Sequence, residues 1–236
     1  MAPGMPYAVA VVPVAGRGLR MGGTTPKQFL ALGGWPMLVH SLRVLELAEL
    51  VTAVVLAVPE ADREFCRNDI VSRHGFAKVT DIVAGGEQRQ DSVRLGLAAI
   101  DARIDLVVVH DAVRPFLTAD MVNRVVMKAA ECGAAVVAIP MRDTVKRIGD
   151  DGLIDGTVDR TPLWLAQTPQ AFKRGLLAEA HQKAVVDGFQ ATDDAQLVER
   201  LGQRVAIVEG TAENIKITRP EDLVIGEAIL AARKGR

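Results

Sequence analysis

The sequence predicts an α/β fold in which one mostly parallel β-sheet carries helices on both faces and a β-hairpin arm projects from the sheet. Short apolar runs rich in Val alternate with segments of helical periodicity along the 236 residues. Such alternation is typical of parallel strands joined by helices. Residues 141–160 break this rhythm, because they are polar and turn at Gly149-Asp150-Asp151-Gly152 between two short runs that contain apolar residues. We expect two strands joined by a tight turn there.

The predicted elements follow one another in order. Short apolar runs fit buried strands, and they cover residues 8–14, 51–58, 79–83, 106–109 and 134–139. The helical segments between them start at Pro36, cover 61–73 and 88–100, and start again after Thr118, a favoured N-cap residue, in a helix that Gly133 ends. Beyond the arm we expect helices near 172–187 and 193–201, a strand at 205–208 and a last helix from Pro220.

Linkers, internal repeats and low-complexity tracts do not interrupt this pattern, so residues 1–236 are expected to form a single domain with a Rossmann-like sheet. Parallel sheets of this kind bind ligands at the carboxyl ends of their strands. Four features of the sequence fall at such ends, namely the loop 15–27, Gly85-Gly86, His110-Asp111 and the segment after Pro140. These features make up the candidate site.

The composition disfavours several classes of protein. Lys and Arg number 28 against 29 Asp and Glu, for a formal net charge of −1, and aromatic residues make up 4%. A nearly neutral chain with few aromatic residues argues against nucleic-acid binding. Cys66 and Cys132 lack the spacing of a zinc site or a disulfide framework, and both are expected to be buried. Because no apolar run reaches ~18 residues and no Lys or Arg precedes Arg17, a cytoplasmic protein is expected.

The loop at residues 15–27, AGRGLRMGGTTPK, combines glycines with two arginines and a lysine. Met21 stands where a dinucleotide-binding loop needs a third Gly, and Thr24 stands where a P-loop needs its Lys. Glycines nevertheless let backbone N–H groups approach a phosphate closely. Residues 1–45 contain no carboxylate that would neutralise the cations. The loop therefore predicts a polyphosphate ligand.

The same loop resembles the G-x-G-x-R-M…P-K signature of sugar nucleotidyltransferases, through Gly16-Arg17-Gly18-Leu19-Arg20-Met21 and Pro26-Lys27-Gln28. Further motifs occur in order along the chain, and together they resemble the 2-C-methyl-D-erythritol 4-phosphate cytidylyltransferases of the non-mevalonate isoprenoid pathway. They are Gly85–Val93 (GGEQRQDSV), Val109–Pro115 (VHDAVRP), Arg142–Lys146 (RDTVK), Thr157–Arg160 (TVDR), Gln167–Gln170 (QTPQ), Thr192–Ala195 (TDDA) and Asn214–Thr218 (NIKIT). One departure is Val14, where Ala is expected.

The resemblance implies transfer of CMP from CTP to 2-C-methyl-D-erythritol 4-phosphate, giving 4-diphosphocytidyl-2-C-methyl-D-erythritol and pyrophosphate in isoprenoid precursor biosynthesis. No general base is expected, because an attacking phosphate with a second pKa of ~6 is already largely a dianion at pH 7. His110 is expected to orient the strand end beside the site. The catalytic residues that the resemblance implies are Arg20, Lys27, Arg160 and Lys216. The nucleotide contacts that it implies are Ala15, Gly16, Arg17, Gly18, Gly85, Gly86, Glu87, Ser92 and Ala112, and the acceptor contacts are Asp111, Arg114, Thr144, Arg160, Thr168 and Lys216.

The resemblance also implies Mg²⁺ or another divalent cation on the CTP phosphates, with no protein metal site, and a homodimer joined through the arm at about residues 141–160. Arg160 lies on this arm, so each active site would be completed by the partner subunit. Neither nucleic acid nor a membrane is expected as a partner. Two alternatives stay open, namely a ribitol-5-phosphate cytidylyltransferase, which would share the nucleotide loop, and a regulator that binds nucleotide without catalysis.

Overall fold

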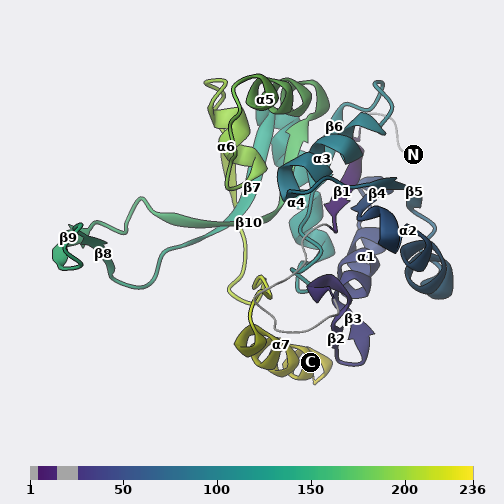
Figure 1. Ribbon diagram of the computed structural model, residues 1–236, viewed down its shortest axis with the longest axis horizontal. Coiled ribbons are helices and arrows are strands. Elements are labelled where there is room, and N and C mark those ends of the chain that lie inside the picture. Colours follow the sequence, from purple (N-terminus) through teal and green to yellow (C-terminus); the bar gives the residue numbers. More distant parts are fainter. Residues whose placement is uncertain (1–4, 15–25, 236) are drawn as a thin grey trace.

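The structure, a computed structural model, describes residues 5–14 and 26–235 (Figure 1). The strands of its main sheet are β1 Ala8–Pro13, β4 Val51–Val58, β5 Val79–Ala84, β6 Leu106–Val109, β7 Ala134–Pro140, β10 Trp164–Lys173 and β11 Ala206–Glu209. Within the described ranges these seven strands lie in the order β11-β7-β10-β6-β1-β4-β5. Parallel pairing of β1 with β4 and β6, of β4 with β5 and of β11 with β7 confirms the predicted mostly parallel sheet.

Strand β10 is the part of the sheet that the sequence did not predict. It runs antiparallel to both β6 and β7, and it occupies the start of the segment expected to be a helix near 172–187. That helix, α5, covers Arg174–Val186 instead. The pattern of β10 is hidden because its middle reads Gln167-Thr168-Pro169-Gln170, and a polar stretch with Pro argues against a central strand. The pairing with β7 is correspondingly irregular between Ala166 and Gln170.

Helices cover both faces of the sheet, as predicted. Because successive residues of a strand point to opposite faces, Ala10 and Val12 of β1 pack with α1 (Met37–Leu47) and α4 (Ala119–Cys132). Val9 and Val11 pack instead with α3 (Arg89–Ala98), α5 and α6 (Asp194–Glu199). Strand β1 is thus buried on both sides, which explains why its sequence is a continuous apolar run.

A third, smaller apolar cluster joins the C-terminal helix α7 (Pro220–Lys234) to the short strand β2 (Ala31–Leu32), which pairs with β3 (Trp35–Pro36). The turn between β2 and β3 is formed by Gly33 and Gly34, whose φ angles of 56° and 84° favour glycine. The backbone N–H of Gly33 donates to Glu227 of α7 at 2.7 Å. The cluster also contains Val113 and Phe116, so α7 supports the loop that follows β6.

The observed helix bounds mostly agree with the predicted ones, and one predicted helix differs in type. The Thr118 side chain accepts a hydrogen bond from Met121 N, and Gly133 ends α4 with a φ of 90°. The predicted helix at 61–73 is in fact a 3₁₀ turn (Glu60–Asp62), a short α2 (Arg63–Phe65) and a π-helical stretch (Cys66–Ser72).

The two cysteines differ in exposure. Cys66 is buried, and this burial raises the pKa of its thiol to about 12. Cys132 is exposed, contrary to the prediction, because it is the last residue of α4.

The predicted arm is present as an antiparallel hairpin of β8 (Val145–Ile148) and β9 (Ile154–Val158). Figure 1 shows it extending away from the sheet on two long connections that leave β7 and enter β10. Leu153 and Ile154, near its tip, are 68% and 63% exposed. No helix in the described part of the chain is long and apolar enough to cross a membrane.

The contact of α3 with the sheet yields a stability prediction. A Cβ at Gly96 of α3 would lie 2.6 Å from Cγ1 of Val11, a buried and β-branched side chain that has little freedom to move. We expect Gly96→Ala to lower the free energy of unfolding by about 1–3 kcal/mol, as measured by urea unfolding. Gly175→Ala in α5 is the matched control, because a Cβ there meets nothing within 4 Å. Equal unfolding midpoints for the two variants would contradict this packing.

Candidate active site

The candidate site begins where β6 ends. Asp111 follows two residues after Val109, the last residue of β6. Strand β10 pairs Gln170 with Val109, so Thr168 lies just beyond the carboxyl end of β6. The backbone N–H of Asp111 donates to the Thr168 hydroxyl at 3.0 Å. The antiparallel strand thereby places a hydroxyl beside the carboxylate at the edge of the sheet where parallel folds bind ligands.

Two cations hold the carboxylate of Asp111. Arg89 Nε lies 2.6 Å from its Oδ1, and Lys216 Nζ lies 2.8 Å from its Oδ2. Burial alone would raise the pKa of this carboxyl, but the charges and hydrogen bonds of Arg89 and Lys216 outweigh burial and hold the pKa well below its usual range. Asp111 is therefore ionised, and it fixes the positions of both cations.

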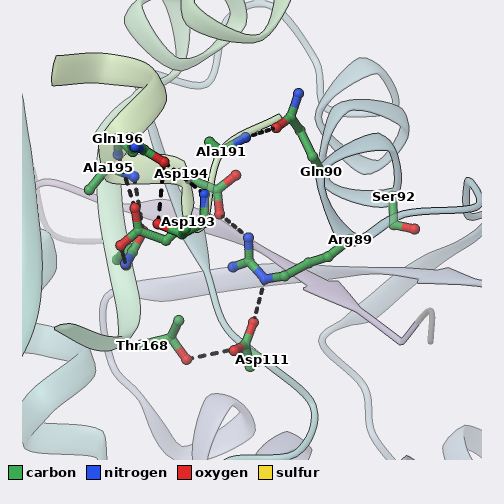
Figure 2. Close-up of polar contacts among 12 residues, drawn as sticks. Arg89, Gln90, Ser92, Asp111, Thr168, Ala191, Asp193, Asp194, Ala195 and Gln196 are labelled. Atoms are coloured by element: carbon green, nitrogen blue, oxygen red, sulfur yellow. Dashed lines mark hydrogen bonds and ion pairs between the residues drawn. The ribbon is translucent and has the colours of Figure 1, made fainter. Parts of the chain in front are cut away.

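Arg89 also reaches a second buried carboxylate (Figure 2). Its Nη1 lies 2.7 Å from Oδ2 of Asp194, the first residue of α6, and His181 of α5 contacts the other oxygen of Asp194 at 3.1 Å. Burial opposes the charge on Arg89, yet Asp194 and Asp111 raise the pKa of the guanidinium above its ordinary value. Arg89 is the first residue of α3, so this one side chain joins α3, the end of β6 and α6.

A second set of hydrogen bonds fixes the loop after β6 to the segment that carries Lys216. Arg114 Nη1 donates to the carbonyl of Asn214 at 2.8 Å. Asn214 in turn donates from Nδ2 to the carbonyl of Thr168 at 2.9 Å. These bonds tie the segment containing Lys216 to both β10 and the β6 loop. The ammonium of Lys216 is thus held by its neighbours in the chain as well as by Asp111.

Two cavities open side by side around this cluster. The first, which we call the Lys27 cavity, has a volume of about 190 Å³ and is lined by Pro13, Val14, Lys27, Gln28, Arg89, Asp111, Ala112, Val113 and Lys216. The second, the Thr168 cavity, has a volume of about 200 Å³ and is lined by Arg89, Asp111, Arg114, Ala166, Gln167, Thr168, Gln170, Thr192, Asp193 and Lys216. Arg89, Asp111 and Lys216 line both cavities, so ligands in the two would meet across these three side chains.

The structure brings several of the predicted residues together. Lys27, Asp111, Ala112 and Lys216 line the Lys27 cavity, and Asp111, Arg114, Thr168 and Lys216 line the Thr168 cavity. The loop after β5 holds Gly85, Gly86 and Glu87, and Ser92 lies in the helix α3 that follows; these four residues line neither cavity. The N–H of Gly86 donates to the Ser92 hydroxyl at 3.1 Å, which joins the loop to the helix. A Cβ at Gly86 would lie 2.2 Å from that of Asp91, so the tight turn requires glycine.

Other predicted residues are not brought to the cluster. Thr144 and Arg160 lie on the arm, where both are exposed and line neither cavity. The guanidinium of Arg160 donates to the carbonyl of Arg142 within the arm. The remaining predicted site residues lie outside the described residues, namely Ala15, Gly16, Arg17, Gly18 and Arg20. Thr144 and Arg160, which the sequence predicts to contact the acceptor substrate, therefore do not join the cluster around Asp111 within a single chain.

Three residues of the site were missed as candidates. Arg89 and Asp194 lie in the GGEQRQDSV and TDDA motifs, each at the first position of a helix, but their 105-residue separation hides the pairing. Gln28, in the PKQ motif, lines the Lys27 cavity and is 1% exposed. Its amide has no hydrogen-bond partner among the described residues. A buried amide facing a cavity without a partner is a candidate ligand contact, because unmet buried hydrogen bonds are costly.

Known proteins are similar to this chain in sequence. The sequence model of a family described as IspD, 2-C-methyl-D-erythritol 4-phosphate cytidylyltransferase, matches residues 8–232. The 2-C-methyl-D-erythritol 4-phosphate cytidylyltransferase of Syntrophus aciditrophicus is 48% identical over 231 residues, which cover 98% of this chain and 99% of that protein. The protein of the same name from Pelotomaculum thermopropionicum is 49% identical over 232 residues, which cover 98% of each chain.

Solved structures agree with the sequence comparisons. The 4-diphosphocytidyl-2C-methyl-D-erythritol synthase of Anaerococcus prevotii superposes with a TM-score of 0.83 at 30% identity, covering 95% of this chain and 98% of that one. The 2-C-methyl-D-erythritol 4-phosphate cytidylyltransferase of Thermus thermophilus superposes with a TM-score of 0.76 at 37% identity, covering 94% and 98%. Sequence and fold thus agree over nearly the whole length, and the chain belongs to the 2-C-methyl-D-erythritol 4-phosphate cytidylyltransferase family.

Proposed function

We propose that the Lys27 cavity receives the phosphates of CTP and that the Thr168 cavity receives 2-C-methyl-D-erythritol 4-phosphate. The chain is a cytidylyltransferase that transfers CMP from the first substrate to the second and releases pyrophosphate. The observation that carries the assignment of the cavities is the position of Lys216, which lines both. A cation shared by two adjacent cavities suits a reaction in which one phosphate attacks another.

The main barrier to this reaction is the approach of two polyanions. Like charges in a low-dielectric cleft repel by several kcal/mol unless cations compensate. Lys27 and Arg20 would stabilise the charge on the α-phosphate and on the departing pyrophosphate, while Lys216 and Arg160 would hold the attacking phosphate. Because that phosphate is largely a dianion at pH 7, it attacks the α-phosphorus directly, and catalysis consists of positioning and charge stabilisation.

The remaining residues divide between the two substrates. Asp111, Arg114, Thr168 and the arm residue Thr144 would contact the acceptor. The residues proposed to contact the cytosine, ribose and phosphates of CTP are Ala15, Gly16, Arg17, Gly18, Gly85, Gly86, Glu87, Ser92 and Ala112.

We also propose that Mg²⁺ or another divalent cation accompanies the triphosphate. No group of three or more His, Cys, Asp or Glu able to hold a metal occurs among the described residues, and both oxygens of Asp111 already contact cations. This donor set fits Mg²⁺ held mainly by phosphate oxygens and water, its usual mode beside nucleotides. When bound, such an ion supplies neutralisation of the phosphate charge.

A homodimer joined through the arm would complete the site. Thr144 and Arg160 are exposed on the arm of the described chain, and the arm also exposes Leu153 and Ile154. Exposed apolar side chains on a projecting hairpin favour a partner surface. In this proposal residues 1–236 form one nucleotidyltransferase domain, the arm at about 141–160 crosses to the partner subunit, and Arg160 enters the partner's cleft.

A substrate matrix tests the proposed function. Pyrophosphate release is measured with Mg²⁺ for CTP, UTP, ATP and GTP, each with 2-C-methyl-D-erythritol 4-phosphate or ribitol 5-phosphate. We expect turnover with CTP and 2-C-methyl-D-erythritol 4-phosphate alone. Turnover with ribitol 5-phosphate would overturn the proposed acceptor site, and binding of CTP without any release would favour a regulator.

The role of Lys27 gives a second prediction. Lys27→Ala should lower kcat by roughly 10²–10³, the usual cost of removing one group that stabilises transition-state charge. Lys128→Ala is the matched control, because Lys128 forms a surface ion pair with Glu131 at 2.9 Å, of a kind that contributes little. A loss of activity below about threefold in folded Lys27→Ala protein would exclude the proposed role.

Subunit mixing tests the shared site. Lys27→Ala and Arg160→Ala proteins are each expected to be nearly inactive, but a mixed dimer would contain one site with both Lys27 and the partner subunit's Arg160 intact. After exchange, half of the dimers are mixed, so about a quarter of wild-type activity should return. Exchange is followed with differently tagged chains. Verified exchange without recovered activity would show that the site does not combine these two residues from different subunits.

A further inference from the structure

His110 is a buried residue of the site to which the proposed mechanism gives no part. It follows β6 directly and is 0% exposed. Its Nδ1 lies 3.0 Å from the hydroxyl oxygen of Thr168, and its Nε2 lies 3.2 Å from the carbonyl oxygen of Arg114. The ring therefore connects β10 to the loop that carries Asp111 and Arg114.

The partners of the ring decide which nitrogen carries the proton. A carbonyl oxygen can only accept a hydrogen bond, so Nε2 must be the donor to Arg114. In a neutral imidazole the other nitrogen then has no proton and is an acceptor. Nδ1 of His110 consequently accepts the hydrogen of the Thr168 hydroxyl. Burial lowers the pKa of His110 to about 4; among the nearby charges, Asp111 raises this pKa, while Arg114 and Arg89 lower it. The ring is therefore neutral at pH 7.

This orientation leaves the Thr168 hydroxyl with one remaining capability. A hydroxyl has one hydrogen and two lone pairs. Its hydrogen is directed to His110, and one lone pair accepts the backbone N–H of Asp111 at 3.0 Å. The second lone pair is the only one left, and Thr168 lines the Thr168 cavity. Toward a ligand in that cavity, Thr168 can therefore accept a hydrogen bond but cannot donate one.

We propose that His110 is a positioning residue that fixes the Thr168 hydroxyl as a hydrogen-bond acceptor for a hydroxyl group of the acceptor alcohol. A phosphate dianion carries no hydrogen to donate, so Thr168 is directed to the polyol part of the substrate and not to its phosphate. The phosphate is left to the cations Lys216 and Arg160. The inference rests on the proposed function for the identity of the alcohol, but the direction of the hydrogen bonds follows from the protein alone.

Two amide variants distinguish the roles of the two ring nitrogens of His110. His110→Asn places an amide oxygen near the position of Nδ1 and so retains an acceptor for the Thr168 hydrogen. His110→Gln reaches the position of Nε2, retains a donor to the carbonyl of Arg114, and removes the acceptor for Thr168. We expect His110→Gln to raise the KM for 2-C-methyl-D-erythritol 4-phosphate roughly tenfold, the effect of one hydrogen bond. In His110→Asn the KM for 2-C-methyl-D-erythritol 4-phosphate should stay within about threefold of the wild-type value. The KM for CTP should change little in either variant.

A double-mutant cycle shows whether His110 acts through Thr168. Thr168→Val removes the hydroxyl, so His110→Gln should raise the KM no further in that background, whereas it should do so in Thr168→Ser, which keeps the hydroxyl. Equal KM values for His110→Asn and His110→Gln, a parallel rise in the KM for CTP, or an additive effect on Thr168→Val would each overturn the proposal.

The tautomer of His110 can be measured in the wild-type protein, so this test does not depend on whether a variant folds. NMR of ¹⁵N-labelled histidine should show a proton on Nε2 and none on Nδ1 at pH 7, and the opposite tautomer would overturn the proposal. Pyrophosphate release by the wild-type enzyme distinguishes a failure of the proposed function from a failure of the role of His110. If the wild type is inactive with 2-C-methyl-D-erythritol 4-phosphate, the proposed function fails. If it is active while the KM is unchanged in His110→Gln, only the role of His110 fails.

Discussion

The site depends on one shared carboxylate. Asp111 contacts Arg89 with one oxygen and Lys216 with the other, and Arg89 contacts Asp194 in turn. Removing one partner from a buried ion pair costs about 3–5 kcal/mol, because an unpaired charge is left behind. The chain of pairs therefore fixes the start of α3, the end of β6, the start of α6 and the segment of Lys216 relative to one another. Both cavities take their common wall from this arrangement.

The same carboxylate reduces the repulsion between the cations of the cleft. A site for two phosphorylated substrates needs several cations close together, but those cations repel one another before the substrates arrive. Asp111 lies between Arg89 and Lys216, and together with Asp194 it balances their two positive charges in the protein without substrate. Its low pKa keeps it ionised over the whole physiological range. The cations can thus be held in place in advance, and this preorganisation is what positioning catalysis requires.

The sequence predicted those features that depend on local pattern and missed those that depend on distant partners. β1 and β6 are recognisable because both faces of each strand are buried and every residue is apolar. β10 was missed because its polar centre, Gln167 to Gln170, serves the site and not the core. Motifs located Lys27, Asp111, Thr168 and Lys216 near the cleft, but the pairing of Arg89 with Asp194 joins residues that no local signal connects. Cys132 was misassigned because it ends a segment whose apolar residues recur at helical spacing, although its own neighbours are Glu131 and Gly133 and the helix ends there.

The arm is attached to the sheet at two neighbouring points. It leaves from the end of β7 and returns at the start of β10, where Pro140 and Trp164 are paired across the two strands. Its base is therefore closed by the sheet itself, while residues beyond that base contribute nothing to the order of the main strands. The turn at its tip, residues 149–153, can therefore change in length without disturbing the sheet, since insertions at exposed loop tips are well tolerated. Thr144 and Arg160 lie closer to the base of the arm, and their proposed part in the partner subunit's site would restrict what can replace them.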